Sequence, residues 1–386
     1  MMNDIEGVGA ELEARKRPMF IWGAGVRCHE NLALRVAEDM NIPVAVTWGA
    51  IDLIRHDHPL FAGGFGTHGN RAANFAIQNS DCICSLGCRL DTKATGTPEH
   101  FAREALIYMV DQDQAEIDKM GKLGITLQAG LCMDVGAFLT ELNEYTFKLR
   151  SHSWKYQIQK WRQMWDNPVV DWPGVNPYQL MRDIAKYTTK DDIIVSDTGT
   201  AIGYVCKAFP FKGERMLHAW NQTPMGYGIP AAIGASFATT RRVILITGDG
   251  SALMSLSDLA LIARWNLNIK IILLNNGGHA MCRQTQRQWL DGNYYSTSEE
   301  GGLAFPNWET VVASFDIPVY WDIQSMFECT NAHDTTDTSG PRFVEIDIHP
   351  DAQLIPQCKF GQPLEDPDPQ LDREEFLHEM IVSPLL

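Results

Sequence analysis

Two apolar runs separated by a helical pattern, within residues 242–279, constrain the fold of this chain more than any other feature. Residues 243–247 and 269–274 are rich in β-branched side chains, as expected for parallel strands buried on both faces. Between them, residues 251–266 carry apolar side chains at the spacing of one helix face. A strand, a helix and a second parallel strand form a right-handed unit whose strands end at the same edge of the sheet. The sequence therefore predicts an α/β domain built on a parallel sheet.

Polar residues follow each of these strands at its carboxyl end. Asp249 follows the first strand and Asn276 follows the second. We expect the two side chains to converge at the edge where open α/β sheets bind ligands. Together with the backbone carbonyl of Gly278, which the glycine pair leaves accessible, they form a set of hard oxygen ligands. Such a set suits Mg²⁺, so Asp249, Asn276 and Gly278 are the predicted metal ligands.

Glycines surround the predicted acid. Gly248 and Gly250 let the backbone approach a ligand closely, and the amides of Gly250 and Ser251 open a helix, where an anion is stabilised. The pattern predicts a diphosphate bridged to the protein by Mg²⁺. Taken separately, each half of the pattern is more often an ordinary turn or loop.

Two segments carry a family resemblance. Gly248-Asp249-Gly250, followed after twenty-four residues by Asn275-Asn276, matches the diphosphate-binding motif of thiamine-diphosphate enzymes. Residues 223–235 resemble the segment that precedes this motif in acetolactate synthases and their relatives. The resemblance extends from about residue 17 to about residue 350. It implies thiamine diphosphate and Mg²⁺ as cofactors.

The resemblance also assigns roles around the cofactor. Met225 matches the apolar residue that lies beneath the thiazolium and holds the cofactor bent, which brings the aminopyrimidine nitrogen to the reactive carbon. His279 is the second catalytic candidate, since histidine moves protons near neutral pH, although a solvated loop residue is the alternative. The expected cofactor-binding residues are Thr200, Thr223, Met225, Gly248, Asp249, Gly250, Ser251, Asn276, Gly278, His279, Ala280 and Met281.

Some positions depart from the family pattern. The usual Gln-His pair of the first diphosphate loop is replaced by Ala201-Ile202, so two side-chain donors are missing. Acetolactate synthases carry a tryptophan that helps to select the acceptor, where this chain has Thr285, with Trp289 further on. The identity of the acceptor is therefore open.

Strand and helix patterns alternate along most of the chain, which indicates doubly wound parallel sheets. Besides the two strands above, we expect strands at residues 18–25, 42–48, 81–86, 106–110, 193–196 and 341–348. The predicted fold class is α/β, with a central Rossmann-like domain and a C-terminal diphosphate-binding domain. The expected boundaries are 1–165 for the central domain, 166–176 for a linker, 177–355 for the diphosphate-binding domain and 356–386 for an irregular C-terminal arm.

The central region has two further features. Residues 138–170 are expected to form a helix whose tryptophans, Trp154, Trp161 and Trp165, serve packing rather than base stacking. Residues 66–74 and 87–91 match segments that contact FAD in flavin-binding relatives, and the resemblance implies Arg89 and Asp111 as nucleotide-binding positions. Gly23 is a third candidate, because Gly23-Ala24-Gly25 is half of a dinucleotide fingerprint whose third glycine is absent. FAD, ADP and no ligand are all compatible with the sequence, and a surface ion pair is the alternative for Arg89.

Composition limits the kinds of binding partner and the cellular compartment that we expect. A formal net charge of −16 disfavours nucleic acid and anionic membranes, and no apolar run approaches the length of a membrane span. The nine cysteines, an odd number, suggest reduced thiols in the cytoplasm. Cys82, Cys84 and Cys88 come close to a metal spacing, but their alternation is that of a strand, so zinc is disfavoured.

Relatives of full length begin with a further domain that binds the aminopyrimidine ring and carries an activating glutamate, and no segment here matches it. A separate polypeptide, a fragment of a longer gene or a non-catalytic cofactor-binding subunit would each explain this, and the first is favoured. The function expected is decarboxylation of a 2-keto acid with transfer to a carbonyl acceptor, in a dimer or heterotetramer. The alternatives are a simple 2-keto acid decarboxylase subunit and a non-catalytic scaffold that binds thiamine diphosphate or a nucleotide.

Overall fold

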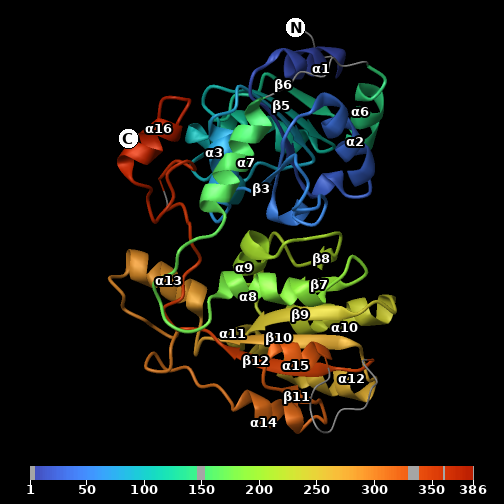
Figure 1. Cartoon of the computed structure of the whole chain (residues 1–386), viewed down its shortest axis with the longest axis vertical. Coiled ribbons are helices and arrows are strands. Elements are labelled where there is room, and N and C mark those ends of the chain that lie inside the picture. Colours follow the sequence, from blue (N-terminus) through green and yellow to red (C-terminus); the bar gives the residue numbers. More distant parts are fainter. Residues whose placement is uncertain (1–4, 146–152, 329–338, 360, 386) are drawn as a thin grey trace. The chain divides into compact units, whose positions relative to one another are not determined.

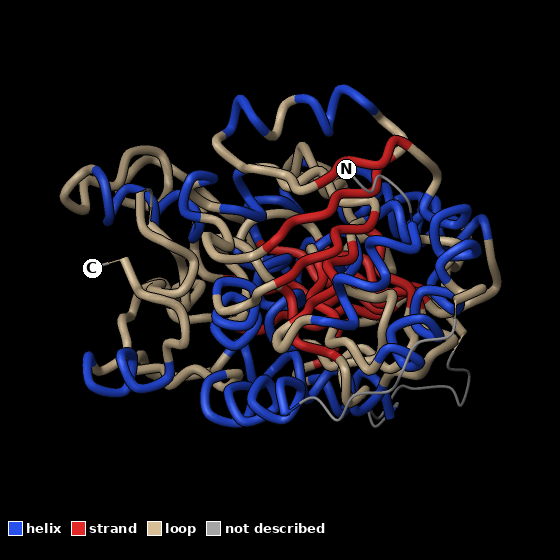
Figure 2. Tube along the Cα trace, turned by 90° about the horizontal axis from the view of Figure 1, so that it is seen from above, coloured by secondary structure: helices blue, strands red, loops and turns tan. Residues whose placement is uncertain are grey.

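The computed structural model of the chain describes residues 5–145, 153–328, 339–359 and 361–385. The chain divides into two compact units: unit 1 comprises Met1–Pro168 and Ile355–Leu386, and unit 2 comprises Val169–Leu354. Each unit contains one six-stranded sheet, and all paired strands in both sheets are parallel (Figure 1). Helices surround the strands (Figure 2), and helices alternate with strands along the sequence of each unit, which confirms the predicted α/β class with two doubly wound sheets.

The sheet of unit 1 has the strand order β3-β2-β1-β4-β5-β6, which is the order of dinucleotide-binding folds. Its strands are β1 Pro18–Trp22, β2 Val44–Val46, β3 Phe61–Gly64, β4 Cys82–Leu86, β5 Leu106–Asp111 and β6 Ala129–Cys132. Its α-helices are α1 Ile5–Ala14, α2 Glu30–Met40, α3 Arg71–Gln78, α4 Thr92–Thr95, α5 Gln114–Asp118, α6 Val135–Leu142, α7 Ser153–Trp165 and α16 Arg373–Glu379.

The sheet of unit 2 has the order β11-β12-β10-β9-β7-β8, and the direction of winding reverses between β7 and β9. Its strands are β7 Ile193–Ser196, β8 Arg215–Leu217, β9 Val243–Gly248, β10 Ile269–Asn275, β11 Val319–Tyr320 and β12 Arg342–Asp347. Its α-helices are α8 Pro177–Ile184, α9 Thr200–Ala208, α10 Gly228–Ala238, α11 Asp249–Met254, α12 Leu259–Arg264, α13 Ala280–Trp289, α14 Trp308–Ala313 and α15 Ile323–Glu328.

Two helix predictions were wrong in extent. The helix expected at residues 251–266 begins at Asp249 and is interrupted after Met254, because the amide of Ser255 bonds to the carbonyl three residues earlier, that of Ala252, and a short 3₁₀ turn follows. The helix expected at 138–170 is two helices, α6 and α7. Residues 143–145 are turns and a bend, residues 146–152 lie outside the described part of the chain, and α7 ends at Trp165.

The tryptophans of α7 belong to the core of unit 1. Trp154, Trp161 and Trp165 are buried, and the rings of Trp161 and Trp165 both contact Phe75 of α3. The ring of Phe376 meets Phe75 edge-on at a centroid distance of 5.8 Å. These contacts confirm the packing role expected for the tryptophan stripe.

The C-terminal segment is held on unit 1 and is not simply an irregular arm, since it contains α16. The buried carboxylate of Glu379 accepts hydrogen bonds from Trp161 Nε1 at 2.6 Å and from Lys160 Nζ at 2.6 Å. The side-chain oxygen of Asn79 accepts from the amides of Ile381 and Val382 at 2.7 and 2.9 Å. A run of polar bonds and aromatic contacts therefore anchors this segment to α3 and α7.

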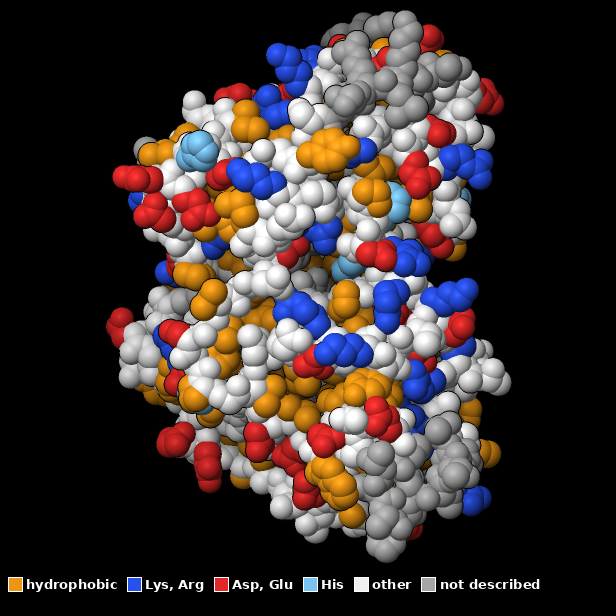
Figure 3. Space-filling model, in the orientation of Figure 1, with side chains coloured by type: hydrophobic (Ala, Val, Ile, Leu, Met, Phe, Trp, Pro, Cys, Tyr) orange, Lys and Arg blue, Asp and Glu red, His pale blue; other side chains and the backbone are white. Residues whose placement is uncertain are grey.

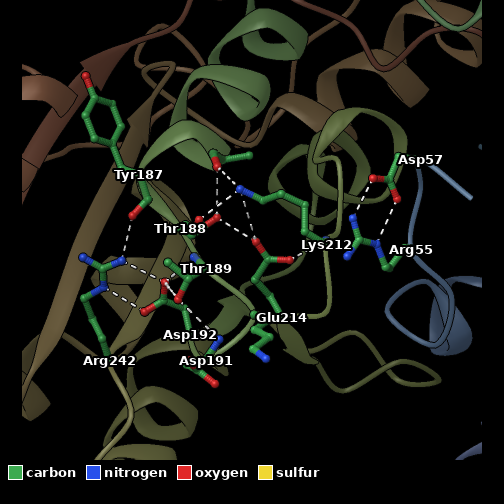
Figure 4. Close-up of polar contacts among 12 residues, drawn as sticks. Arg55, Asp57, Tyr187, Thr188, Thr189, Asp191, Asp192, Lys212, Glu214 and Arg242 are labelled. Carbon is green, nitrogen blue, oxygen red and sulfur yellow. Dashed lines mark hydrogen bonds and ion pairs between the residues drawn. The ribbon is translucent and has the colours of Figure 1, made fainter.

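A polar cluster lies at the amino ends of three strands in unit 2 (Figure 4). Two nitrogens of the Arg242 side chain, Nε and Nη2, each donate to the Asp192 carboxylate at 2.8 Å. This pair joins the start of β9 to the start of β7. The carboxylate of Glu214, next to the start of β8, is buried and accepts from the Thr188 hydroxyl at 2.8 Å. These bonds hold together the edge of the sheet opposite to the one where Asp249 stands.

Hydrophobic side chains also reach the surface of the protein (Figure 3). In unit 2 the exposed ones include Phe237 of α10, Met254 of α11 and Trp265 just after α12, and the rings of Phe237 and Trp265 lie 6.0 Å apart. Contiguous exposed apolar patches are typical of surfaces that other proteins cover. In the described part of the chain, no helix has the length and apolarity that a membrane crossing requires.

Candidate functional site

A cavity of about 220 Å³ opens in unit 2 at the carboxyl ends of β7, β9 and β10. This edge includes the point between β7 and β9 where the winding reverses, which is where open α/β sheets bind ligands. All twelve of the predicted cofactor-binding residues line the cavity. Five further residues complete the lining: Thr198, Gly199, Ala201, Leu274 and Cys282.

Asp249 connects the two strand ends that the sequence singled out. Its side chain is buried, with 1% of its surface exposed. One carboxylate oxygen accepts from the amide of Gly250 at 2.8 Å, and the other accepts from the amides of Gly278 at 2.9 Å and Asn276 at 3.3 Å. Burial raises the pKa of Asp249, and these hydrogen bonds, together with the charge of Arg283, offset only part of that rise. A buried carboxylate with a raised pKa is one that a nearby cation would stabilise.

The turn after β10 depends on its glycines. Gly277 and Gly278 have φ values of 64° and 159°, and a Cβ on Gly278 would lie 2.2 Å from the carbonyl oxygen of Thr297. Asn275 fixes the start of the turn, since its side-chain oxygen accepts from the Gly277 amide at 3.0 Å and its nitrogen donates to Glu345 at 2.6 Å. The glycines and the two bonds of Asn275 therefore support the backbone of the turn that carries Asn276.

Arg283 is a site residue that the sequence reasoning missed. It lies in α13, is 6% exposed, and donates to the side-chain oxygen of Asn276 at 3.0 Å. Burial lowers the pKa of Arg283, although Asp249 and Asp351 act in the opposite direction. The sequence feature that could have indicated Arg283 is a positively charged residue in the first turn of the helix that follows the glycine pair.

Met225 and His279 both approach Gly250. A Cβ on Gly250 would lie 2.5 Å from Nδ1 of His279 and 3.3 Å from the terminal methyl of Met225. The residue at 250 must therefore be glycine for the imidazole to take this position. The two residues predicted to be catalytic thus stand side by side above the start of α11.

Asp197 organises the other wall of the cavity and was also missed. It is fully buried at the end of β7, and its carboxylate accepts from the amides of Thr198 and Gly228, each at 2.8 Å. These two bonds tie the loop that leads to Thr200 to the start of α10, just after Met225. The signal in the sequence was an acid directly after a predicted strand, as for Asp249.

The predicted nucleotide positions of unit 1 lie at the carboxyl ends of β1, β4 and β5. Gly23 is in close contact with the loop that follows the neighbouring strand β4, since a Cβ at residue 23 would lie 2.1 Å from the carbonyl oxygen of Gly87. Arg89 is half-exposed and pairs with Glu116 at 3.0 Å, and this ion pair raises the pKa of Arg89. Asp111 is buried and accepts from the amide of Asp113 at 3.0 Å. The ion pair corresponds to the alternative given for Arg89, and no ligand role follows from these contacts.

The cysteines of the described residues are free thiols. Cys82 and Cys84 are buried in β4, and Cys88 is buried in the loop that follows. Burial raises the pKa of Cys82 and of Cys88 to about 12. Across the described ranges, no group of three or more His, Cys, Asp or Glu side chains is arranged to hold a metal ion. The position of Cys82 and Cys84 within β4 confirms the strand interpretation of this segment.

Fold and site together define a class. A parallel α/β unit with an acid and an amide at adjacent strand ends, a glycine turn after the amide and a cavity above them is typical of domains that bind a phosphorylated cofactor. Residues 197–346 match the family model described as thiamine pyrophosphate enzyme, C-terminal TPP binding domain. Residues 5–142 match the model for the central domain of the same enzymes. The chain belongs to the thiamine pyrophosphate enzymes, as the sequence motifs predicted, and carries these two domains.

Among curated proteins, the chain is similar to acetolactate synthase large subunits. It is 27% identical over 360 residues to isozyme 1 of Escherichia coli (strain K12), covering 92% of this chain and 63% of that protein. It is 32% identical over 290 residues to the large subunit of Lactococcus lactis subsp. lactis (strain IL1403), with coverages of 73% and 49%. For E. coli isozyme 2 the identity is 30% over 310 residues, with coverages of 76% and 54%. The chain therefore spans about half to two thirds of the length of these relatives.

Proposed function

We propose that this chain is a subunit of a thiamine-diphosphate- and Mg²⁺-dependent enzyme of the acetolactate synthase type, which decarboxylates a 2-keto acid and joins the product to a carbonyl acceptor. The observation that carries the proposal is the Asp249 carboxylate, bonded to the amides of Asn276 and Gly278 at the floor of a cavity lined by every predicted cofactor residue. Thiamine diphosphate, when bound, would supply the stabilised carbanion that this chemistry requires.

The residues present suit a Mg²⁺–diphosphate group. Asp249, Asn276 and the carbonyl of Gly278 supply three oxygen ligands, and Mg²⁺ commonly completes its shell with phosphate and water. The amides of Gly250 and Ser251 and the hydroxyl of Thr200 would bind the phosphate oxygens. Because Ala201 offers no side-chain donor, the metal ligands and the backbone carry most of this binding.

Met225 and His279 would act on the reactive part of the cofactor. Met225 stands against Gly250, where a bulky apolar side chain can support the bent form and shorten the path for proton removal. His279 lines the same cavity and is placed to give or take a proton during release of the product.

The experiment that tests the proposal is product analysis. The chain, combined with the polypeptide that supplies the pyrimidine-binding half, is given thiamine diphosphate, Mg²⁺ and pyruvate, with and without a ketone or aldehyde acceptor, and both CO₂ release and the joined product are measured. A joined product supports the proposal. CO₂ and a free aldehyde alone would indicate the second candidate, a simple decarboxylase. This candidate is favoured by Thr285, which stands where acetolactate synthases carry the tryptophan that helps to select the acceptor.

We also propose that a second polypeptide supplies the pyrimidine-binding half and that the enzyme is a dimer or heterotetramer in the cytoplasm. The exposed Phe237, Met254 and Trp265 support a subunit contact on the surface formed by α10, α11 and the end of α12. Co-purification of the tagged full chain, followed by mass measurement of the complex, tests this arrangement. A monomeric chain that is fully active alone would contradict it.

Two readouts separate this proposal from the remaining alternatives. A non-catalytic scaffold would bind thiamine diphosphate yet turn over no 2-keto acid with any candidate partner. A flavin bound through Gly23, Arg89 and Asp111 would give the purified protein its characteristic visible absorption.

A further inference from the structure

Arg283 is a buried cation directly beneath the turn that carries the proposed metal ligands. It belongs to α13, and 6% of its surface is exposed. A buried arginine is rare unless its donors are used, because the loss of hydration must be offset by hydrogen bonds.

The donors of Arg283 are directed at the backbone of three segments. Nη2 donates to the carbonyl oxygens of Asn276 and Pro350, each at 3.0 Å. Nη1 donates to the carbonyl oxygens of Gly277 at 3.3 Å and Thr297 at 3.4 Å. One guanidinium therefore joins the turn after β10 to two other loops.

The same group also orients a side chain. Nη2 lies 3.0 Å from Oδ1 of Asn276, so the amide oxygen faces the guanidinium and the flipped amide is disfavoured. An amide oxygen has two lone pairs, and it can accept from Arg283 while it presents the second pair to a cation. Gly278 completes the fit, since a Cβ there would lie 2.5 Å from Nη1.

We propose that Arg283 is a positioning residue that holds Asn276 and the Gly277-Gly278 turn in the shape required to bind Mg²⁺. The inference rests on the proposed Mg²⁺–thiamine diphosphate site and adds the residue that preorganises it. Mg²⁺ demands near-ideal octahedral geometry, whereas Ca²⁺ accepts flexible and irregular ligand sets. A rigid turn therefore increases the affinity for Mg²⁺ more than the affinity for Ca²⁺.

Two effects of the guanidinium oppose each other. Its positive charge disfavours a second cation nearby, and its hydrogen bonds favour the ligand geometry. The buried Asp249 carboxylate compensates the charge, while five acceptors depend on the hydrogen bonds, so the positioning effect outweighs the repulsion. Loss of a group that orients a metal ligand typically weakens metal binding about 10- to 100-fold.

The test compares metal affinities in the full chain by calorimetric titration of Mg²⁺ or Ca²⁺ in the presence of thiamine diphosphate. For Arg283→Met we expect Mg²⁺ to bind about 10- to 100-fold more weakly and Ca²⁺ to lose much less affinity. Arg283→Lys keeps the charge and part of the bonding, so an intermediate loss is expected. Arg287→Met, on the next turn of α13, removes an ion pair with Asp351 outside the cavity and should leave both affinities unchanged.

Three results would overturn the inference. Unchanged or tighter Mg²⁺ binding in Arg283→Met would show that repulsion outweighs positioning. An equal loss for Mg²⁺ and Ca²⁺, with a lowered melting temperature, would indicate general support of the fold. If Arg283→Met does not fold, Arg283→Lys decides, and wild-type Mg²⁺ affinity in that variant would also contradict the inference. Absence of thiamine diphosphate binding by the wild-type chain, both alone and with the polypeptide that supplies the pyrimidine-binding half, would instead remove the proposed function, and this inference with it.

Discussion

Replacing Asp249 by asparagine should separate cofactor binding from stability. In the ligand-free protein the amide oxygen of asparagine can still accept from Asn276 and Gly278, so one hydrogen bond, that from Gly250, is lost at a cost of about 1 kcal/mol. Burial raises the pKa of Asp249, which means that the folded state disfavours the charged form at neutral pH. The neutral amide removes that penalty, and the two effects nearly cancel. We expect the melting temperature without ligand to change little.

The effect on binding should be large. Removing one partner of a buried charge pair costs about 3–5 kcal/mol, which corresponds to at least a 100-fold weaker complex. At a ligand concentration of 100 times the dissociation constant, the wild-type protein gains about 2.7 kcal/mol, and a 100-fold weaker variant gains about 0.4 kcal/mol. For a domain of this size, 1 kcal/mol shifts the melting temperature by about 2–4 °C. The expected shifts are about 5–11 °C for the wild type and about 1 °C for Asp249→Asn.

Thermal unfolding with and without Mg²⁺ and thiamine diphosphate measures both quantities in one experiment. Asp258→Asn is the matched control, since it makes the same change of charge a few residues further along, outside the cavity lining. It should retain the full ligand-induced shift. A shift in Asp249→Asn greater than half that of the wild type would refute the metal assignment, and unfolding of the ligand-free variant would refute the stability reasoning.

Three further predictions concern other residues. Met225→Ala should lower kcat at least tenfold while the affinity for thiamine diphosphate stays within about threefold, and Met225→Leu should remain close to wild type; steady-state kinetics with pyruvate distinguishes the two. Burial alone would raise the pKa of Glu379, but the hydrogen bonds from Lys160 and Trp161 lower it below the ordinary value of glutamate. The charged Glu379 therefore stabilises the folded state at a pH above the ordinary glutamate pKa, and this stabilisation is lost as the pH falls through the lowered pKa. Glu379→Gln should therefore destabilise unit 1 by about 1.5–3 kcal/mol at pH 7 and by less near pH 4 in urea titrations. Burial lowers the pKa of His56 to about 3, so the unfolded chain binds a proton that the folded chain does not. Stability should fall by up to about 1.4 kcal/mol per pH unit below pH 6.5, and His56→Gln should remove that part of the slope, whereas an unchanged slope would contradict the assignment.

The inner strands of both sheets could be predicted from the sequence, and the strands at the sides of the sheets could not. The predicted strands correspond to β1, β2, β4, β5, β7, β9, β10 and β12, all of which have neighbours on both sides. The missed strands, β3, β6, β8 and β11, are the four edges, and they are only two to four residues long. An edge strand has fewer buried positions and so carries a weaker apolar pattern. The edge strand β6, with the sequence Ala-Gly-Leu-Cys, shows this clearly, since Leu131 is its one buried residue.

The positions of candidate site residues could be predicted where a residue directly follows a recognisable strand. Asp249 and Asn276 each follow a strand directly, and parallel pairing brings such residues together whatever the rest of the fold does. Arg283 could not be found in this way, because its partners include Thr297 and Pro350, which only the folded chain brings within reach. Asp197 had the same signal as Asp249, but the role of its carboxylate becomes visible only through the amide of Gly228, thirty-one residues later.

The discontinuity of unit 1 has a consequence for synthesis of the protein. Its closing segment, from Ile355 onward, is translated after the whole of unit 2, yet it supplies Phe376 to the aromatic core and Glu379 to Trp161. A nascent chain can therefore complete the cofactor-binding unit on the ribosome while the unit that began first still lacks part of its interior. The order of folding during translation is thus expected to run against the order of the domains, with unit 1 reaching its final state only after unit 2 has been synthesised.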